Sequence, residues 1–369
     1  MNPINSKKGA TNGSAIVVGA SLSGLMTGIA LAREGVQVTL LEKVGSGHRS
    51  GAGLQVDAAR FNATGTERLL RNLASGGKRS IQLWSSIESR LRKEAEEDSR
   101  IELRYDTRVE FVDQDNTSAF VMTDAGETIH GDLLIGADGH HSLVRRHVAP
   151  DNPEATFAGY MVWIASTKEE ELPPHMCPGY HHPEVTMLES LNGFLFGSII
   201  ESGGESGNRR IGCTWYDNSR NELLRHLGCV EGNVVKHSLK GPDIPQETID
   251  ELATLVSVRW DEPWKSGMLH ALQHRNLTGT PIKEYVPTQL VHGRIALIGD
   301  AAHVPAPITA SGFNASLQDA VDLGKCVSKG IEGTAAIKAL KNYESLRLQK
   351  VRKMVQSGQT YNRSFGLGR

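Results

Sequence analysis

The sequence lacks the features that mark several large classes of protein. Its four cysteines, Cys177, Cys213, Cys229 and Cys326, are scattered and form no C-x-x-C pair. This spacing argues against a zinc site, a dithiol redox pair and a disulfide framework, so we predict reduced thiols and no metal. No apolar run reaches the roughly 18 residues of a membrane helix, and the polar tail over 1–13 lacks the apolar core of a signal peptide. We therefore expect a cytoplasmic protein with no membrane contact.

Charge gives no sign of a large partner. The formal net charge is -2, and no run of Lys or Arg is long enough to indicate nucleic-acid binding. The 369 residues suit one large domain or two interlocked ones, as a monomer or a homodimer, and no internal repeat is visible. The 39 glycines exceed average usage, and several fall at the ends of predicted strands, as expected where the backbone approaches a ligand.

The stretch around Asp300 is the first to predict a ligand site. Residues 295–298 form a short, branched apolar run that is typical of a buried parallel strand, and Gly299 and Asp300 end it. A carboxylate at this position lies at the carboxyl edge of the sheet, where open α/β sheets bind their ligands.

The residues that follow point the same way. A loop with Pro305 and Pro307 leads to Gly312 and Asn314, which open a predicted amphipathic helix over 313–329. The first N–H groups of a helix have no partner within it and favour a polar or anionic ligand edge. Together these features predict a clamp on a flat polar cofactor. Taken alone, an ordinary strand, turn and helix would explain the stretch equally well.

A second nucleotide-type signal lies near the N-terminus. A predicted strand over 14–18, a helix over 22–33 and a strand over 36–41 surround the turn Gly19-Ala-Ser21-Leu-Ser-Gly24 and end at Glu42. This order fits the dinucleotide fingerprint, in which a pyrophosphate lies over the helix N-terminus and the acid binds a ribose hydroxyl. Ser21 replaces the second glycine of the fingerprint. The acid disfavours a 2′-phosphate, which predicts FAD or NAD rather than NADP.

Two further stretches hold candidate polar residues. A strand over 132–136 leads to Asp138 and then to a helix with Arg145, so these side chains could bind ribose and pyrophosphate. An exposed basic helix after a strand is the simpler explanation if this stretch stood alone. His48 and Arg49 lie among four glycines, in a segment that either approaches a ligand or is a surface loop.

The second half of the chain changes character. From about residue 151, short apolar runs are separated by Gly, Pro, Asn and Asp and predict an antiparallel sheet. The expected strands cover 161–165, 185–188, 194–200 and 211–216. Helices are predicted over 246–254 and, at the end of the chain, over 334–354.

Three of these motifs in this order resemble the single-component FAD-dependent aromatic hydroxylases, built like para-hydroxybenzoate hydroxylase. They are Gly19-x-Ser21-x-x-Gly24 with Glu42, Asp138-Gly139, and Gly299-Asp300 with its Pro/Gly/Asn tail. Two softer matches, over 157–163 and 214–218, are similar to the branch that contains 2,6-dihydroxypyridine hydroxylase. The sequence departs from the family pattern where Ile164-Ala165 replaces Arg-Gly, and where the segment between Gly53 and Trp84 is short.

The resemblance implies an α/β fold. A Rossmann-like FAD-binding domain with a parallel sheet would be interleaved with a mainly antiparallel β-sheet substrate domain, followed by a C-terminal helix. The implied boundaries are a disordered tail over 1–13 and FAD-binding parts over 14–150 and 286–369, with the substrate domain over 151–285. The segment 54–80 would contribute to the substrate domain as well.

The resemblance also implies roles for individual residues. Glu42 and its neighbour Lys43 would hold the adenosine end, with Val109 at the adenine and the fingerprint turn under the pyrophosphate. Asp138 and Arg145, with Arg49 near them, would serve the FAD pyrophosphate and the transient nicotinamide donor. Asp300 would bind the ribityl chain beside Gly299. The isoalloxazine ring would be lined by Pro307, Gly312 and Asn314.

The implied reaction is that of a monooxygenase. FAD would be reduced by NADH or NADPH, and dioxygen would then deliver one oxygen atom through a flavin hydroperoxide to a small aromatic or N-heteroaromatic substrate. Of four side chains considered for the pocket, His48, Tyr216, His270 and His303, we select Tyr216 and His48 as catalytic candidates, and expect His303 to shape the ring environment. Epoxidation, reduction, halogenation and a non-catalytic flavin sensor stay open as alternatives.

Overall fold

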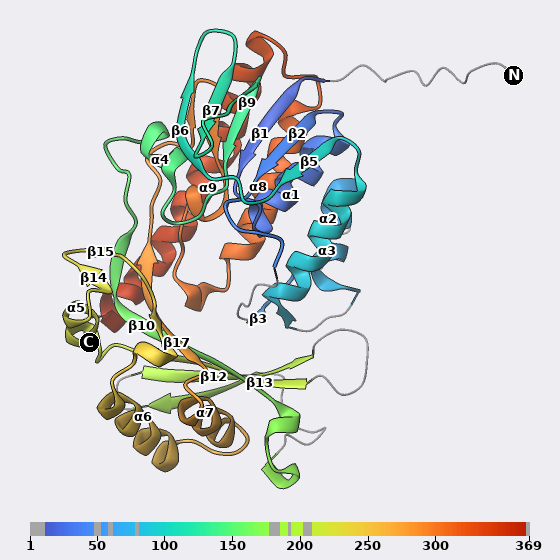
Figure 1. Cartoon of the computed structure of the whole chain (residues 1–369). Helices are drawn as coiled ribbons and strands as arrows, with labels where there is room; N and C mark the ends of the chain where they lie inside the picture. The colour runs from blue at the N-terminus through green and yellow to red at the C-terminus, as the bar shows by residue number, and fades with distance from the viewer. Residues whose placement is uncertain are drawn as a thin grey trace, which may run out of the picture.

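The protein is described by a computed structural model over residues 12–47, 53–57, 62–77, 81–176, 185–190, 193–201 and 209–366. Two large sheets organise it, one above the other in Figure 1, and a long C-terminal helix runs from the first toward the second. The chain builds most of the first sheet, crosses to build the second, and then returns to complete the first.

The first sheet is parallel except at one edge. Its strands are, in spatial order, β18 (Val291–His292), β19 (Ile295–Leu297), β9 (Leu133–Gly136), β1 (Ser14–Val18), β2 (Gln37–Leu41) and β5 (Ile101–Arg104). Only β18 runs antiparallel to its neighbour. Strands β1, β9 and β19 are almost entirely buried, because helices cover the sheet as in other α/β folds.

Helix α1 (Leu22–Arg33) shows how tightly this half is packed. It is buried on nearly every side and contacts both the sheet and helix α8 (Gly312–Val327). A Cβ at Gly28 would lie 2.7 Å from Leu40 Cδ1, so the glycine allows the helix to approach β2 closely. Helices α2 (Gly65–Ser75), α3 (Trp84–Glu97) and α4 (Leu143–Val148) complete the covering layer.

The second sheet is antiparallel. Its main path is β11 (Val185–Ser190), β12 (Gly193–Glu201), β13 (Arg209–Asp217), β10 (Thr156–Lys168), β15 (Val234–Val235) and β14 (Val230–Glu231). Strand β17 (Leu277–Glu284) also pairs with β10 and with β16 (Leu239–Lys240). One face packs against α6 (Gln246–Arg259) and α7 (Trp264–Gln273), and the other faces the first sheet.

The smaller elements lie around these two sheets. A three-stranded meander of β6 (Val109–Gln114), β7 (Ala119–Thr123) and β8 (Thr128–Gly131) flanks the parallel sheet, and β3 (Gly53–Leu54) pairs with β4 (Gln82–Leu83). The remaining pieces are α5 (Asn221–His226) and the 3₁₀ turns η1 (Glu169–Glu171), η2 (Pro174–Met176), η3 (Gly241–Asp243), η4 (Gly299–Ala301) and η5 (Pro307–Thr309).

The C-terminal helix α9 (Thr334–Gly366) is longer than the predicted 334–354 and joins the two halves. It packs on α8 near its start and on β10 near its end. There Tyr160 Oη donates to Asn362 Oδ1 at 2.9 Å, and Asn362 Nδ2 donates to Glu284 at 2.8 Å. In the described part of the chain, no helix is long and apolar enough to cross a membrane.

The predicted fold class is confirmed: a parallel nucleotide-binding sheet, an antiparallel second sheet and a C-terminal helix. Among the elements that were not predicted from the sequence are α7 and β17. Pro281 lies within β17 and pairs with Met161 where the register of β10 shifts, so its missing N–H interrupts no regular ladder. The residue limits of the two domains stay a prediction.

Candidate cofactor and substrate cavity

A cavity of about 960 Å³ lies between the carboxyl edge of the parallel sheet and the face of the antiparallel sheet that turns toward it. Strands β1, β2, β9 and β19 all end at that edge, because they run parallel. Residues that are more than a hundred positions apart in the sequence therefore line one space, such as Gly19, Asp138 and Asp300.

The turn after β1 is built so that only glycine fits at its start. Gly19 has φ +97°, and a Cβ there would lie 2.6 Å from the carbonyl oxygen of Ala137. A Cβ at Gly24 would lie 1.9 Å from the carbonyl oxygen of Gly19, so the first turn of α1 closes directly on the loop. Gly24 therefore shapes the turn from behind, whereas Gly19 and Ser21 line the cavity. The Ser21 side chain makes no capping bond to α1.

Glu42 lies at the end of β2 on the cavity wall. Its carboxylate accepts hydrogen bonds from the N–H of Ala20 at 3.0 Å and of Val44 at 3.1 Å, which fix its orientation at the fingerprint turn. Lys43 and Val109 also line this end of the cavity. The structure thus brings together the residues that the resemblance assigned to the adenosine end.

Asp138 and Arg145 have contacts that the sequence did not predict. Asp138 lines the cavity, but its carboxylate caps α4 by accepting from Ser142 Oγ and from the N–H groups of Leu143 and Val144. Arg145 is fully buried, and its guanidinium lies over the ring of Tyr285 at 4.4 Å.

Among the described residues, the guanidinium of Arg145 donates to protein carbonyls. Its partners are the carbonyl oxygens of Pro153, His140, Asp300 and Ala301. Arg145 does not line the cavity, and its role as a phosphate ligand stays a prediction. Its place is beneath the turn that carries Asp300.

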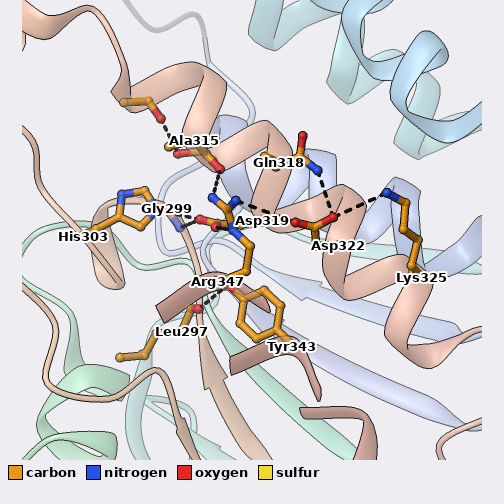
Figure 2. Close-up of polar contacts among 12 residues, drawn as sticks. Leu297, Gly299, His303, Ala315, Gln318, Asp319, Asp322, Lys325, Tyr343 and Arg347 are labelled. Carbon is orange, nitrogen blue, oxygen red and sulfur yellow. Dashed lines mark hydrogen bonds and ion pairs between the residues drawn. The ribbon is translucent and has the colours of Figure 1, made fainter. Parts of the chain in front are cut away.

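Asp300 projects into the cavity from a fixed turn. Its side chain is 52% exposed, and His140 Nδ1 lies 3.8 Å from its carboxylate. Gly299 does not line the cavity; its N–H donates to Asp319 at 3.1 Å, and a Cβ at this glycine would lie 2.6 Å from Ser23 Cβ (Figure 2). Gly299 therefore positions its neighbour, and Asp300 is the residue of the pair that lines the cavity.

The loop before α8 forms the next part of the wall. Pro307 and Gly312 line the cavity, as predicted, together with Pro305. Asn314 is not among the lining residues. Its Oδ1 accepts from Arg71 Nη1 at 3.1 Å and faces the N–H of Asp57 at 3.4 Å, so it ties α8 to α2 instead.

The antiparallel sheet supplies the apolar end. Val162 and Ile164 of β10 lie opposite Tyr216 and Thr214 of β13, and all four line the cavity. The Tyr216 ring stacks on Phe194 at 4.5 Å between centroids. Burial raises the pKa of Tyr216 well above its usual value, so its hydroxyl stays protonated and acts as a hydrogen-bond donor rather than a base.

Lys283 is a cavity residue that the sequence analysis missed. It lies on β17, a strand that was not predicted from the sequence, and its Nζ is 3.1 Å from His141 Nε2. Burial lowers the pKa of Lys283 to about 8 and, together with the nearby Lys283 charge, lowers the pKa of His141 to about 4. His141 is therefore neutral near pH 7, and its Nε2 accepts a hydrogen bond from the Lys283 ammonium.

The other histidines considered for the pocket lie elsewhere. His48 and Arg49 fall outside the described residues. Within the described part of the cavity wall, neither His270 nor His303 appears. His270 pairs with His274 on α7, and His303 is fully buried against Asp319. In the described ranges, no three His, Cys, Asp or Glu side chains gather closely enough to hold a metal.

These features fit a dinucleotide joined to a flat ring. The Gly19 turn leaves space for a pyrophosphate beside the first-turn N–H groups of α1, which have no intrahelical partner. Glu42 lies at one end, and Asp300, Pro307 and Gly312 lie farther along the same cavity. The volume of about 960 Å³ suits a ligand of that size.

Comparison with known proteins agrees with this geometry. A family model described as "FAD binding domain" matches residues 13–80 and 60–358. The chain is 24% identical over 396 positions to the 3-hydroxybenzoate 6-hydroxylase of Klebsiella oxytoca, covering 95% of this chain and 88% of that protein. It is also 24% identical to an FAD-dependent urate hydroxylase of Klebsiella pneumoniae, covering 92% and 87% of the two chains.

The fold has solved counterparts. The structure of 2,6-dihydroxypyridine-3-hydroxylase from Arthrobacter nicotinovorans superposes with a TM-score of 0.78 at 21% identity, covering 97% of this chain and 94% of that one. The family match spans most of the chain, and the cavity has the elements that FAD requires. The chain therefore belongs to the FAD-binding class A monooxygenases, which share the para-hydroxybenzoate hydroxylase fold.

Proposed function

We propose that this protein uses NADH or NADPH and dioxygen to hydroxylate a small aromatic or N-heteroaromatic ring. The observation that carries the proposal is the continuity of the cavity, which runs from the Gly19 turn to the apolar face of the antiparallel sheet. The bound FAD would supply the oxygen-activating chemistry, which no amino-acid side chain performs. The protein would bind the reactants, orient them and keep water away.

The residues at the nucleotide end would hold the cofactor. Gly19 and Ser21 would lie under the pyrophosphate, Glu42 would accept from a ribose hydroxyl, and Asp300 would bind the ribityl chain. Lys43 and Val109 would close the adenosine end, since both line that part of the wall. Asp138 would act through the start of α4, because its carboxylate is engaged there.

The apolar end would hold the substrate ring. Val162, Ile164 and Ile282 offer aliphatic surface, and Tyr216 offers a hydroxyl that remains protonated. A protonated Tyr216 would orient a ring hydroxyl, carbonyl or ring nitrogen by donating to it. Pro307 and Gly312 would lie between this end and the cofactor, so the ring would rest against the flavin.

The consumption of NADH or NADPH tests the proposal. The purified protein would be reconstituted with FAD, and NADH and NADPH oxidation would be followed across phenols, hydroxybenzoates and hydroxypyridines with mass analysis of products. We expect one aromatic compound to stimulate oxidation and to gain one oxygen atom. Oxidation that yields only peroxide with every compound would contradict the hydroxylase assignment. FAD binding without any donor oxidation would indicate a flavin sensor.

Substituting Tyr216 tests the assignment of the substrate end. Tyr216→Phe keeps the ring stack on Phe194 but removes the hydroxyl. We expect the KM of the aromatic substrate to rise about tenfold, the loss of about 1.4 kcal/mol for one hydrogen bond in a buried site, while FAD affinity is unchanged. An unchanged KM would place the substrate elsewhere.

A further inference from the structure

A buried charged cluster contacts Gly299, the residue that precedes Asp300 (Figure 2). Its members are Asp319 of α8, His303 after η4, and Arg347 of α9, which are 0%, 0% and 5% exposed. Asp319 Oδ1 accepts from Arg347 Nε at 2.8 Å, and Asp319 Oδ2 lies 2.7 Å from His303 Nε2. We call these three residues the Asp319 cluster. None of them lines the cavity wall as described.

The cluster holds the turn by its backbone. The same Oδ2 that faces His303 also accepts from the N–H of Gly299 at 3.1 Å. Gly299 is the last residue before Asp300, and its φ of +57° sets the direction in which the chain leaves β19. Tyr343 Oη donates to the carbonyl oxygen of Leu297 at 3.0 Å, so α9 reaches the end of the same strand. Asp319 and Tyr343 therefore hold the backbone where β19 leads into this turn.

A second buried group holds the turn from its other side. Arg145 Nη1 donates to the carbonyl oxygens of Asp300 at 3.3 Å and of Ala301 at 3.1 Å. The N–H of Gly299 is thus bound to a carboxylate, and the carbonyls of Asp300 and Ala301 are bound to a guanidinium. The backbone is held on both sides of Asp300, and its side chain faces the cavity.

Asp319 stays ionised despite its burial. Burial alone would raise the pKa of Asp319, but the charges of His303 and Arg347 outweigh it and hold the pKa below its usual value. His303 keeps its contact although its Nδ1 has no partner among the described residues. Leaving a buried ring nitrogen unpaired costs free energy. The position of the His303 ring is therefore set by its contact with Asp319 and not by the needs of Nδ1.

We propose that Asp319 is a positioning residue for the cofactor: through the N–H of Gly299 it fixes the direction of the Asp300 carboxylate. The inference rests on the proposed contact of Asp300 with FAD. Arg347 of α9 balances the buried negative charge of Asp319 and is not itself required for the hydrogen bond to Gly299.

A matched pair of variants separates this role from general stabilisation. In both, Arg347→Met removes the guanidinium so that no unpaired cation is left, since a buried pair removed together is tolerated far better than one partner alone. Asp319→Asn then keeps an oxygen of the same size for the Gly299 N–H, whereas Asp319→Leu removes it. The measurements are the FAD dissociation constant and the thermal midpoint of the apoprotein.

We expect the Asn version to bind FAD within about threefold of the unmodified protein. The Leu version should bind at least tenfold more weakly, since loss of one hydrogen bond is worth about a factor of ten. The thermal midpoints of the two apoproteins should be similar. Equal FAD affinity in the two versions would overturn the proposal. Failure of both to fold would also overturn it, because the cluster would then stabilise the whole protein rather than the turn. If only the Leu version fails to fold, weak binding by the Asn version overturns the proposal and near-normal binding supports it.

Asp300→Ala distinguishes a failure of this inference from a failure of the role of Asp300. If Asp319 acts through Asp300, the difference between the Asn and Leu versions disappears in the Asp300→Ala background, because the two effects are coupled. A difference that persists in full would contradict the proposal. If Asp300→Ala alone leaves FAD affinity unchanged, the assignment of Asp300 fails, and the role of Asp319 fails with it while the monooxygenase proposal stands.

Discussion

At the scale of single residues, Glu42 is the side chain whose role can be tested most directly. Its carboxylate is held by the N–H groups of Ala20 and Val44 and lines the adenosine end of the cavity. We expect Glu42→Gln to weaken FAD binding by about 10–100-fold, because a hydrogen bond to a charged group contributes about 1.5–3 kcal/mol. Fluorescence titration of the apoprotein measures it. Glu110→Gln, an exposed change of the same kind on β6, should leave the affinity unchanged.

Lys283 gives a prediction for pH. Burial lowers its pKa to about 8, so the ammonium is present below that pH and is lost as pH rises through it. An anionic ligand in the cavity, such as NADH or NADPH, should therefore bind more weakly above pH 8, with KM rising between about pH 7 and 9. Steady-state kinetics across this range test it, with Lys283→Met expected to flatten the profile. A Lys283→Met profile that keeps the full rise would assign the titration to another group.

At the scale of elements, Arg71 connects three pieces of the cavity wall. From α2 it donates to Asn314 Oδ1 at the start of α8 and to the carbonyl oxygen of Asp57 beyond β3, while Glu67 holds its Nε at 3.1 Å. Residues 53–55 of that segment line the cavity. The network therefore fixes the distance between this segment and the loop expected at the flavin ring.

We expect Arg71→Met to destabilise the protein by about 1–3 kcal/mol, since Asn314 loses one of its donors and the buried Glu67 loses the guanidinium. Substrate KM should also rise, because the wall at 53–55 loses its anchor. Urea unfolding and steady-state kinetics measure the two effects. Lys93→Met, an exposed change on α3, is the control. If the stability fell with no change in KM, Arg71 would support the fold but not the wall.

At the scale of the whole molecule, α9 is the element that ties the two sheets together. Asn362, 2% exposed, accepts from Tyr160 of β10 and donates to Glu284 of β17, while the first half of the helix packs on α8. The rings of Tyr361 and Phe365 add edge contacts to Tyr160. The end of the helix is thus anchored on the sheet that carries the substrate wall.

Asn362→Ala should lower the free energy of unfolding by about 1–3 kcal/mol, because the buried Tyr160 hydroxyl and a Glu284 oxygen lose a partner. Chemical denaturation monitored by fluorescence measures it. Gln356→Ala, on the exposed side of the same helix, should change stability by no more than about 0.5 kcal/mol. Equal effects from the two changes would mean that the contacts of Asn362 contribute nothing specific.

Local sequence signals were sufficient for the parallel half of the fold. The helix over 22–33 and the strand over 14–18 have the predicted bounds, because apolar spacing and the glycine turn act within a few residues. Glycine at position 19 follows from the same local geometry. The residues at the carboxyl ends of the strands could be expected to meet, because parallel strands end at one edge.

Tertiary packing decided which side chains are free to reach a ligand. Arg145 and Asn314 belong to the predicted motifs, yet in the structure their side chains form hydrogen bonds with other protein groups. Lys283 lines the cavity from β17, a strand that was not predicted. The sequence by itself determined the family and the cofactor edge, since those depend on short-range backbone patterns. Whether a polar side chain faces the cavity or a buried partner depends on residues more than a hundred positions away, such as Asp300 and Ala301, whose carbonyls accept from Arg145. Only the folded chain brings these residues into contact.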